Sequence, residues 1–219
     1  MWKVFPKLGL LKLLFLIFSA LFLSALIIVF SSSQEDTFTW SNFGVALELA
    51  TPVTLLFIAF IYILGKWGWL LLWEAPFLGR IMHKTICPNL NGEWLGEIQS
   101  NFEDSDSNHV IKKVVLRIKA DIFGFDVKLK SQDGYQESKV TQSELYKDPR
   151  TNTFYLSYIF EANVPFPEDT DDRLFEGAAK LEIIVNSEDT VMKGTYWTNR
   201  AFQRGKNTAG VIAISRSNS

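Results

Sequence analysis

The chain has 219 residues, of which 47% are hydrophobic and 21% are charged, and its formal net charge is −2. This near-neutral charge argues against a binder of nucleic-acid duplexes, which usually carries a basic excess. The single cysteine, Cys87, excludes an internal disulfide, and with only two histidines the chain has no zinc-ligand pattern. The mean hydropathy of +0.09 does not distinguish a soluble protein from a membrane protein, so the distribution of hydropathy along the chain has to be considered.

Charge is distributed unevenly, and the composition changes at Pro88. Residues 1–87 contain 10 charged side chains and carry a net charge of +2, whereas residues 88–219 contain 36 and carry −4. We therefore expect two domains, an apolar region over 1–87 and a charged domain over 88–219.

Residues 1–87 include two apolar stretches long enough to cross a bilayer of roughly 30 Å. We expect membrane helices over about residues 8–30 and 52–73, joined by a polar link. Lysine and arginine flank the pair and the link has only acidic charges, so the positive-inside rule places both termini in the cytoplasm. A cleaved signal peptide is the competing interpretation of the first stretch, but the apolar run is long for one. The tryptophans expected to anchor the helices at the interfaces are Trp40, Trp67, Trp69 and Trp73.

From residue 90 onward, apolar residues alternate and turn residues recur at regular intervals, which indicates β-strands. The expected strands are 90–101, 109–120, 122–131, 138–146, 152–162, 173–186, 190–200 and 209–216. This pattern predicts an eight-stranded antiparallel up-and-down β-barrel, with a two-sheet sandwich as the alternative.

The seventh expected strand ends on an arginine whose side chain is expected to face inward. Tyr196, Thr198 and Arg200 share one face of that strand, and an inward arginine is costly unless it is paired or meets an anion. In an up-and-down barrel this strand ends at the rim far from the membrane tether, near Tyr158 of the fifth strand. A phosphate and a stacked base are ligands that such a rim can hold.

Simpler interpretations exist for the same residues. Arg200 can pair with Glu161 or Glu176 instead of meeting a ligand. Trp94 stands in a G-x-W tripeptide that resembles the one in lipocalins, where a tryptophan plugs the closed end of the barrel, so a core position is expected for it. Neither a G-x-S-x-G, a Walker A nor an H-E-x-x-H motif occurs, so we expect no enzyme, no metal site and no cofactor.

The order of these features resembles a known family. A two-helix hairpin precedes residues 88–96 (PNLNGEWLG), eight strands follow, and residues 194–200 (GTYWTNR) stand shortly before 210–212 (GVI). The chain is similar in this respect to the SMODS-associated two-TM β-strand-rich effectors of bacterial cyclic-oligonucleotide anti-phage signalling (CBASS). The resemblance implies a barrel that senses a cyclic di- or trinucleotide made by a cognate nucleotidyltransferase. It also implies that the activated protein forms homo-oligomers and disrupts the lipid of the inner membrane, which kills the infected cell.

The two motifs supply Trp94 and Arg200 as candidate ligand-binding residues, and barrel geometry adds Thr198, Tyr196 and Tyr158. A membrane-tethered, lipocalin-like carrier of a small apolar ligand is the alternative, and it predicts an apolar interior with Arg200 packed on Trp94. A plain membrane-bound interaction module with a filled barrel is a further alternative.

Overall fold

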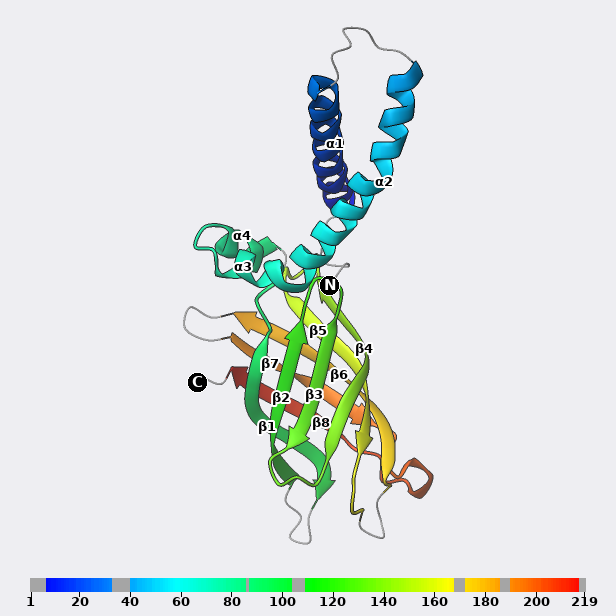
Figure 1. Cartoon of the computed structure of the whole chain (residues 1–219). Helices are drawn as coiled ribbons and strands as arrows, with labels where there is room; N and C mark the ends of the chain where they lie inside the picture. Colours follow the sequence, from blue (N-terminus) through cyan, green and yellow to red (C-terminus); the bar gives the residue numbers. More distant parts are fainter. Residues whose placement is uncertain are drawn as a thin grey trace.

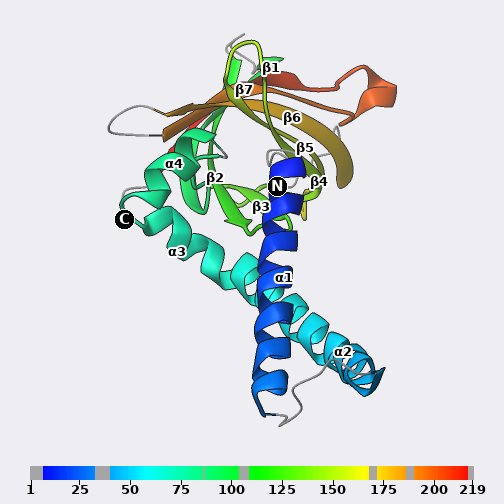
Figure 2. The ribbon, with the colours of Figure 1, turned by 90° about the horizontal axis from the view of Figure 1, so that it is seen from above.

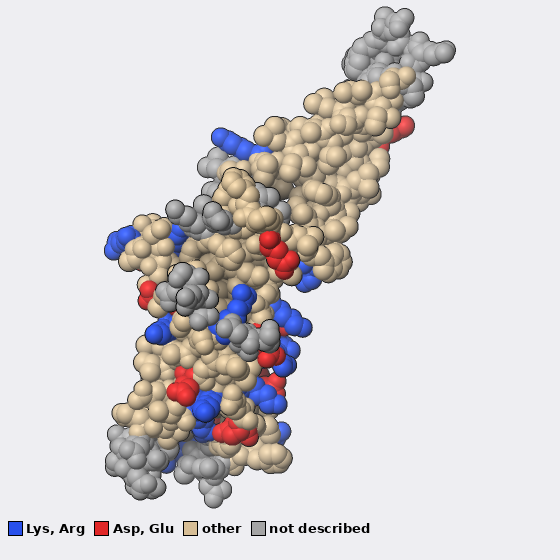
Figure 3. Space-filling model, turned by 90° about the vertical axis from the view of Figure 1, so that its left-hand side faces the viewer, with Lys and Arg blue, Asp and Glu red and all other residues tan. Residues whose placement is uncertain are grey.

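Two long apolar helices stand on one end of a β-barrel in the computed structural model of this chain (Figure 1). The structure describes residues 7–32, 40–85, 87–103, 109–167, 172–185 and 190–216. On the face seen in Figure 3, the charged side chains gather over the barrel, while the long helices are almost entirely uncharged.

The first helix, α1 (Lys7–Ser32), and the second, α2 (Trp40–Ile63), contain candidate membrane spans at Leu11–Ile28 and Leu47–Leu71. The two helices contact each other, for example through an edge-to-face pair of Phe18 and Phe57 with ring centroids 5.3 Å apart. The prediction of two long apolar helices is confirmed. Most of the expected polar link, residues 33–36, lies outside the described residues.

The second long helix begins earlier than residue 52, where the second membrane helix was predicted to start. Pro52 was expected near its start but lies inside α2. An apolar membrane helix tolerates an internal proline because neighbouring groups compensate the lost hydrogen bond. Beyond α2 the chain continues as a π-helical turn, η1 (Leu64–Gly68), then as α3 (Trp69–Glu74) and α4 (Leu78–Thr85). Seen from above in Figure 2, α3 and α4 lie beside the end of the barrel that carries the helices.

Only one of the three tryptophans in this segment is available to an interface. Trp67 is exposed, whereas Trp69 and Trp73 are buried with ring centroids 3.8 Å apart. The indole N–H of Trp73 donates to the carbonyl oxygen of Cys87 at 2.9 Å. The expectation of an interfacial anchor is therefore wrong for Trp69 and Trp73, and the hydrogen bond of Trp73 fastens α3 to the start of the barrel domain. The side chain of Trp40 is outside the described part of the structure.

The barrel is closed, and each strand pairs antiparallel with its neighbours in sequence, which confirms the up-and-down topology and rejects the sandwich. The strands are β1 (Gly92–Glu103), β2 (His109–Ala120), β3 (Phe125–Ser131), β4 (Glu137–Lys147), β5 (Phe154–Asn163), β6 (Leu174–Val185), β7 (Thr190–Thr198) and β8 (Ala209–Arg216). Pairing of β1 with β8 closes the ring.

Alternation along the strands places one side chain in two inside the barrel, as expected from a period of two. In β5 and β6, and in β2 from Val114 onward, the inward positions are buried and the outward ones are mostly exposed. Phe123 and Val185 are exceptions. Alternation along the expected strands 122–131 and 173–186 predicts inward positions for both, but they are 42% and 53% exposed because one lies in a turn and the other at a strand end.

The seam between β3 and β4 is the sparsest in the ring. These strands pair only at Lys128–Lys130 with Glu137–Lys139, whereas each other neighbouring pair of strands is matched at seven or more positions. Because ladder hydrogen bonds hold adjacent strands together, this seam is where the barrel wall is least constrained.

Candidate ligand-binding site in the barrel

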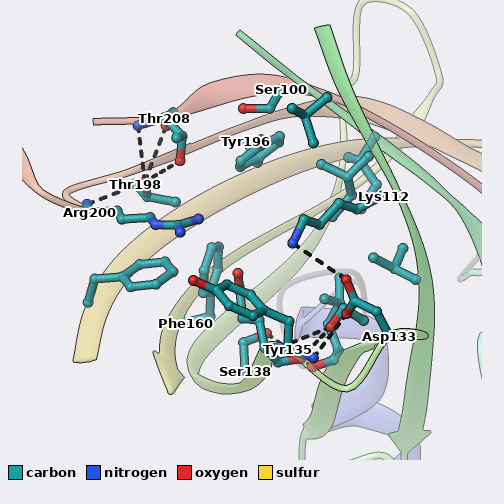
Figure 4. Close-up of a pocket in the computed structure, with 18 of the residues that line it drawn as sticks. Ser100, Lys112, Asp133, Tyr135, Ser138, Phe160, Tyr196, Thr198, Arg200 and Thr208 are labelled. Carbon is teal, nitrogen blue, oxygen red and sulfur yellow. Dashed lines mark hydrogen bonds and ion pairs between the residues drawn. The ribbon is translucent and has the colours of Figure 1, made fainter. Parts of the chain in front are cut away.

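A cavity of about 430 Å³ occupies the half of the barrel that lies away from the helices. This volume lies within the roughly 300–1,000 Å³ typical of small-molecule sites. Its wall combines aromatic rings with a few polar and charged groups (Figure 4). The aromatic members are Tyr135, Tyr158, Phe160, Phe175 and Tyr196.

Four of the five residues singled out from the sequence line this cavity, namely Tyr158, Tyr196, Thr198 and Arg200. The structure therefore brings together residues from β5, from β7 and from the turn after β7. Trp94 does not line it.

Arg200 lies beyond the strand on which it was expected, because β7 ends at Thr198. Its guanidinium nevertheless reaches into the cavity, with its carbon 5.5 Å from the ring centroid of Phe175 and 6.0 Å from that of Tyr135. The two acids considered as partners, Glu161 and Glu176, are exposed and line a separate hollow on the outer surface. The cationic group therefore lies over aromatic faces at the cavity wall.

The hydroxyl of Thr198 was expected to contact a ligand, but it is engaged within the protein. It lies 2.7 Å from the hydroxyl of Thr208 and accepts the backbone N–H groups of Thr208 and Arg200 at 3.3 and 3.4 Å. These contacts join the two ends of the β7–β8 connection. In this structure Thr198 therefore positions the turn that carries Arg200.

Lys112 also lines the cavity, and it was not among the residues predicted from the sequence. Its Nζ lies 3.5 Å from Oδ2 of Asp133 and 4.3 Å from the ring centroid of Tyr135. The sequence does indicate an inward position for Lys112, because Lys112 has the same parity along β2 as the buried Val114 and Leu116. A lysine within the inward row of β2 is as informative as the arginine that was expected at the end of β7.

Asp133 is held as a carboxylate by its surroundings. A hydrogen bond with Ser131 and the donated backbone N–H of Tyr135 at 3.0 Å hold the pKa of Asp133 below its usual range, with a smaller contribution from Lys112. The cavity wall thus includes three cationic side chains, Lys112, Arg200 and the exposed Lys206, and one anionic side chain, Asp133, on the turn between β3 and β4.

The two tyrosines predicted to contact a base remain protonated at neutral pH. Burial raises the pKa of Tyr158, and burial likewise raises that of Tyr196. Beside Tyr196, strands β8 and β1 approach closely because residue 210 is a glycine. A Cβ at position 210 would lie 2.0 Å from the carbonyl oxygen of Gln99 and 3.0 Å from the ring of Tyr196. Neutral phenol rings of this kind offer apolar faces with a polar edge.

Trp94 closes the other end of the barrel. Its side chain is fully buried, and its indole N–H donates to the carbonyl oxygen of Leu90 at 2.9 Å. The guanidinium of Arg216 lies 5.6 Å from the centre of the ring system and donates to the carbonyl oxygens of Asn89 and Asn91. The plug expected for a lipocalin-like barrel is therefore present, but its arginine is Arg216.

The fold and the cavity define a class of protein, a β-barrel receptor attached to a pair of candidate membrane helices. Residues 85–216 match the family described as "Cap15, cyclic dinucleotide receptor domain". The chain is also 36% identical over 166 residues to the CD-NTase-associated protein 15 of Escherichia albertii, a match that covers 76% of this chain and 78% of that protein. The chain therefore belongs to the Cap15 family of CBASS effectors, and its barrel is a cyclic dinucleotide receptor domain.

Proposed function

We propose that the cavity binds a cyclic dinucleotide, and that binding causes the protein to oligomerise and to disrupt the inner membrane of the infected cell. The main support for this proposal is that Arg200, Lys112 and several aromatic rings line one cavity of a cyclic dinucleotide receptor domain. A cyclic dinucleotide presents two phosphodiesters and two bases, and these groups call for cations and for flat apolar faces.

Two of the cationic side chains in the cavity wall, Arg200 and Lys112, approach the cavity from different parts of the barrel. Figure 4 shows Arg200 and Lys112 reaching toward the same space from the β7 and β2 sides. We assign one phosphate to each cation and a base to the neighbouring rings of Tyr158 and Tyr196. A phosphate on Lys112 would compete with Asp133 for its ammonium group. Because residues 88–219 carry a net charge of −4, attraction for an anion must come from such local groups.

The alternative of a carrier for a small apolar ligand has less support. It requires an apolar interior and an arginine plug made by Arg200, whereas the cavity wall includes Lys112, Asp133 and Arg200. Arg216 occupies the plug position beside Trp94.

The helices support the membrane part of the proposal. Both candidate spans are almost wholly unburied within the protein, and large apolar side chains such as Phe15, Leu56 and Leu71 are exposed. Burial of this surface in lipid is favourable. We place the helix pair, 1–87, in the inner membrane with both termini in the cytoplasm, as the basic flanks favour, and the receptor domain, 88–219, in the cytoplasm. Clustering of many barrels would gather two helices per chain into one patch of bilayer.

A calorimetric titration of the full chain in detergent tests the binding site. The panel is cyclic di-AMP, cyclic di-GMP and cyclic GMP–AMP, with linear pApA for comparison. Arg200→Ala and Lys112→Met are each expected to weaken binding by roughly 10- to 100-fold, because each removes a charge-assisted contact to phosphate. Lys113→Met is the matched control, since Lys113 is the next residue of β2 and is exposed outside the barrel.

Unchanged affinity in Arg200→Ala and Lys112→Met would contradict the assigned site. The membrane step is tested separately, by release of a trapped dye from vesicles that contain the full chain. Dye release on addition of the tightest-binding cyclic dinucleotide supports membrane disruption. Binding without release would contradict it while leaving the receptor site in place.

A further inference from the structure

The turn between β2 and β3, residues 121–124, contacts the second membrane helix at η1. The ammonium group of Lys66 lies 2.6 Å from Oδ2 of Asp121. One residue further on, the backbone N–H of Ile122 donates to the carbonyl oxygen of Gly65 at 3.2 Å. An ion pair and a backbone hydrogen bond therefore connect the barrel to the membrane helix at adjacent positions.

The fit at this junction, formed by η1 and residues 121–124, leaves no room for a side chain at Gly65. A Cβ there would lie 2.5 Å from Cγ2 of Ile122 and 2.7 Å from the ring of Phe123. The ring of Phe123 also stacks on that of Tyr62, two residues before η1 begins, with centroids 6.1 Å apart. This contact explains why Phe123 lies outside the barrel although its parity favours the inside.

Both sides of the junction have a defined local geometry. Oδ1 of Asp121 accepts the backbone N–H groups of Phe123 and Gly124 at 2.8 and 2.9 Å, which fixes the turn. Burial alone would raise the pKa of Asp121, but the bonds from Lys66 and from those N–H groups together hold it below its usual range. On the helix side, π-helical turns are rare and occur frequently at functional sites.

The turn is one end of a hairpin whose other end forms part of the cavity wall. β2 and β3 pair without interruption from Val114 with Ser131 to Ala120 with Phe125. Lys112 stands just beyond the cavity end of this ladder, about 30 Å along the strand from the junction at roughly 3.3 Å per residue. The hairpin is thus a continuous two-stranded element between the cavity and the helix.

The far edge of the hairpin is loosely held, because β3 pairs with β4 only at Lys128–Lys130. Displacement of the hairpin toward or away from the cavity therefore breaks few ladder hydrogen bonds on that side. An element that is rigid along its length and weakly fixed along one edge can adopt two positions.

We propose that the β2–β3 hairpin transmits occupancy of the cavity to the second membrane helix through the contact of residues 121–124 with η1. A phosphate that engages Lys112 shifts the hairpin, and the turn moves the π-helical segment to which it is bound. This mechanism rests on the proposed nucleotide binding, and it adds how that binding reaches the membrane.

Amide hydrogen exchange on the full chain in lipid nanodiscs tests the mechanism. The probe is whichever of cyclic di-AMP, cyclic di-GMP and cyclic GMP–AMP binds most tightly. In the wild type we expect the nucleotide to change exchange at residues 62–68 and 121–124. In Asp121→Asn, which keeps the acceptor for the turn N–H groups, and in Lys66→Met we expect that change to fall by roughly twofold to fivefold, the range expected for one partly exposed ion pair. Gly65→Val is expected to abolish it.

The matched control is the ion pair of Arg117 with Glu93, which has the same N–O distance of 2.6 Å but joins two strands of the barrel, β2 and β1. Arg117→Met and Glu93→Gln are expected to keep the full response. Nucleotide affinity should change less than about twofold in all these variants, which also shows that the barrel is folded.

A bound nucleotide that leaves exchange at residues 62–68 unchanged would overturn the mechanism, as would a full response in Asp121→Asn and Lys66→Met. Failure of the proposed function has a different signature. If the junction responds but vesicles release no dye, the mechanism stands and membrane disruption is wrong. If none of the three nucleotides binds, the titration itself contradicts both proposals.

Discussion

Trp94 offers a direct test of which end of the barrel binds the ligand and which end is closed by a plug. Its side chain is fully buried and its indole N–H bonds to the carbonyl oxygen of Leu90. Replacement of Trp94 by phenylalanine removes the indole N–H and leaves the buried carbonyl oxygen of Leu90 without this donor. The free energy of unfolding should fall by about 1–3 kcal/mol as a result. Replacement by alanine also leaves a large cavity and costs about 3–5 kcal/mol in the free energy of unfolding.

The unfolding of the full chain in detergent can be followed by reaction of Cys87 with a maleimide. Cys87 is the single cysteine of the chain and is fully buried, so it reacts when the barrel opens. Urea midpoints should therefore fall in the order wild type, Trp94→Phe, Trp94→Ala. Trp197→Phe is the control, because Trp197 is 52% exposed on the outside of β7 and surface changes usually stay within about 0.5 kcal/mol.

Nucleotide affinity completes this test. Because Trp94 lies outside the cavity wall, folded Trp94→Phe should bind the tightest cyclic dinucleotide within about twofold of wild type. A variant with an unchanged urea midpoint and clearly weakened binding would refute the plug and return Trp94 to the ligand site.

Two further predictions concern the barrel wall and its buried thiol. A Cβ at Gly194 would lie 1.9 Å from the carbonyl oxygen of Lys180, so Gly194→Ala should force β6 and β7 apart and destabilise the fold by about 1–3 kcal/mol; thermal unfolding by circular dichroism measures this, and an unchanged midpoint would contradict it. Burial raises the pKa of the Cys87 thiol, so above about pH 8.5 the unfolded state loses a proton that the folded state keeps. The free energy of unfolding should then fall by up to about 1.4 kcal/mol per pH unit. Urea unfolding of Cys87→Ala, followed by tryptophan fluorescence, should lack this additional slope, and equal slopes in both proteins would rule out the thiol as its source.

The candidate site was only partly accessible from the sequence. Parity along β7 identified Tyr196 and Thr198, and it led to Arg200 even though that residue lies past the end of the strand. The same reasoning on β2 would have found Lys112. No strand pattern could have identified Asp133, since it lies in the β3–β4 turn, where side-chain direction follows from loop geometry and not from a period of two.

Trp69, Trp73 and Phe123 show the same limit in the membrane-proximal region. Tryptophans next to an apolar span are typical of the bilayer interface, but Trp69 and Trp73 pack inward because α3 folds onto the start of the barrel domain. Phe123 has inward parity yet contacts Tyr62 of α2. A hydropathy pattern indicates that a side chain is buried away from water, but it does not indicate whether lipid or another part of the protein buries it.

Local periodicity was sufficient for the two apolar helices, the eight strands and the faces of most strands, because each follows from neighbours a few residues apart. Closure of the ring, the sparse β3–β4 seam and the placement of Lys112, Asp133 and Arg200 around one cavity depend on register between distant strands. The contact of Asp121 with Lys66 likewise joins residues 55 positions apart. Only tertiary packing determines such pairs, since their energy depends on distances that no local pattern encodes. The whole-chain averages, a mean hydropathy near zero and a near-neutral charge, conceal an apolar helix pair with few charges and an acidic barrel whose cavity wall carries Lys112 and Arg200.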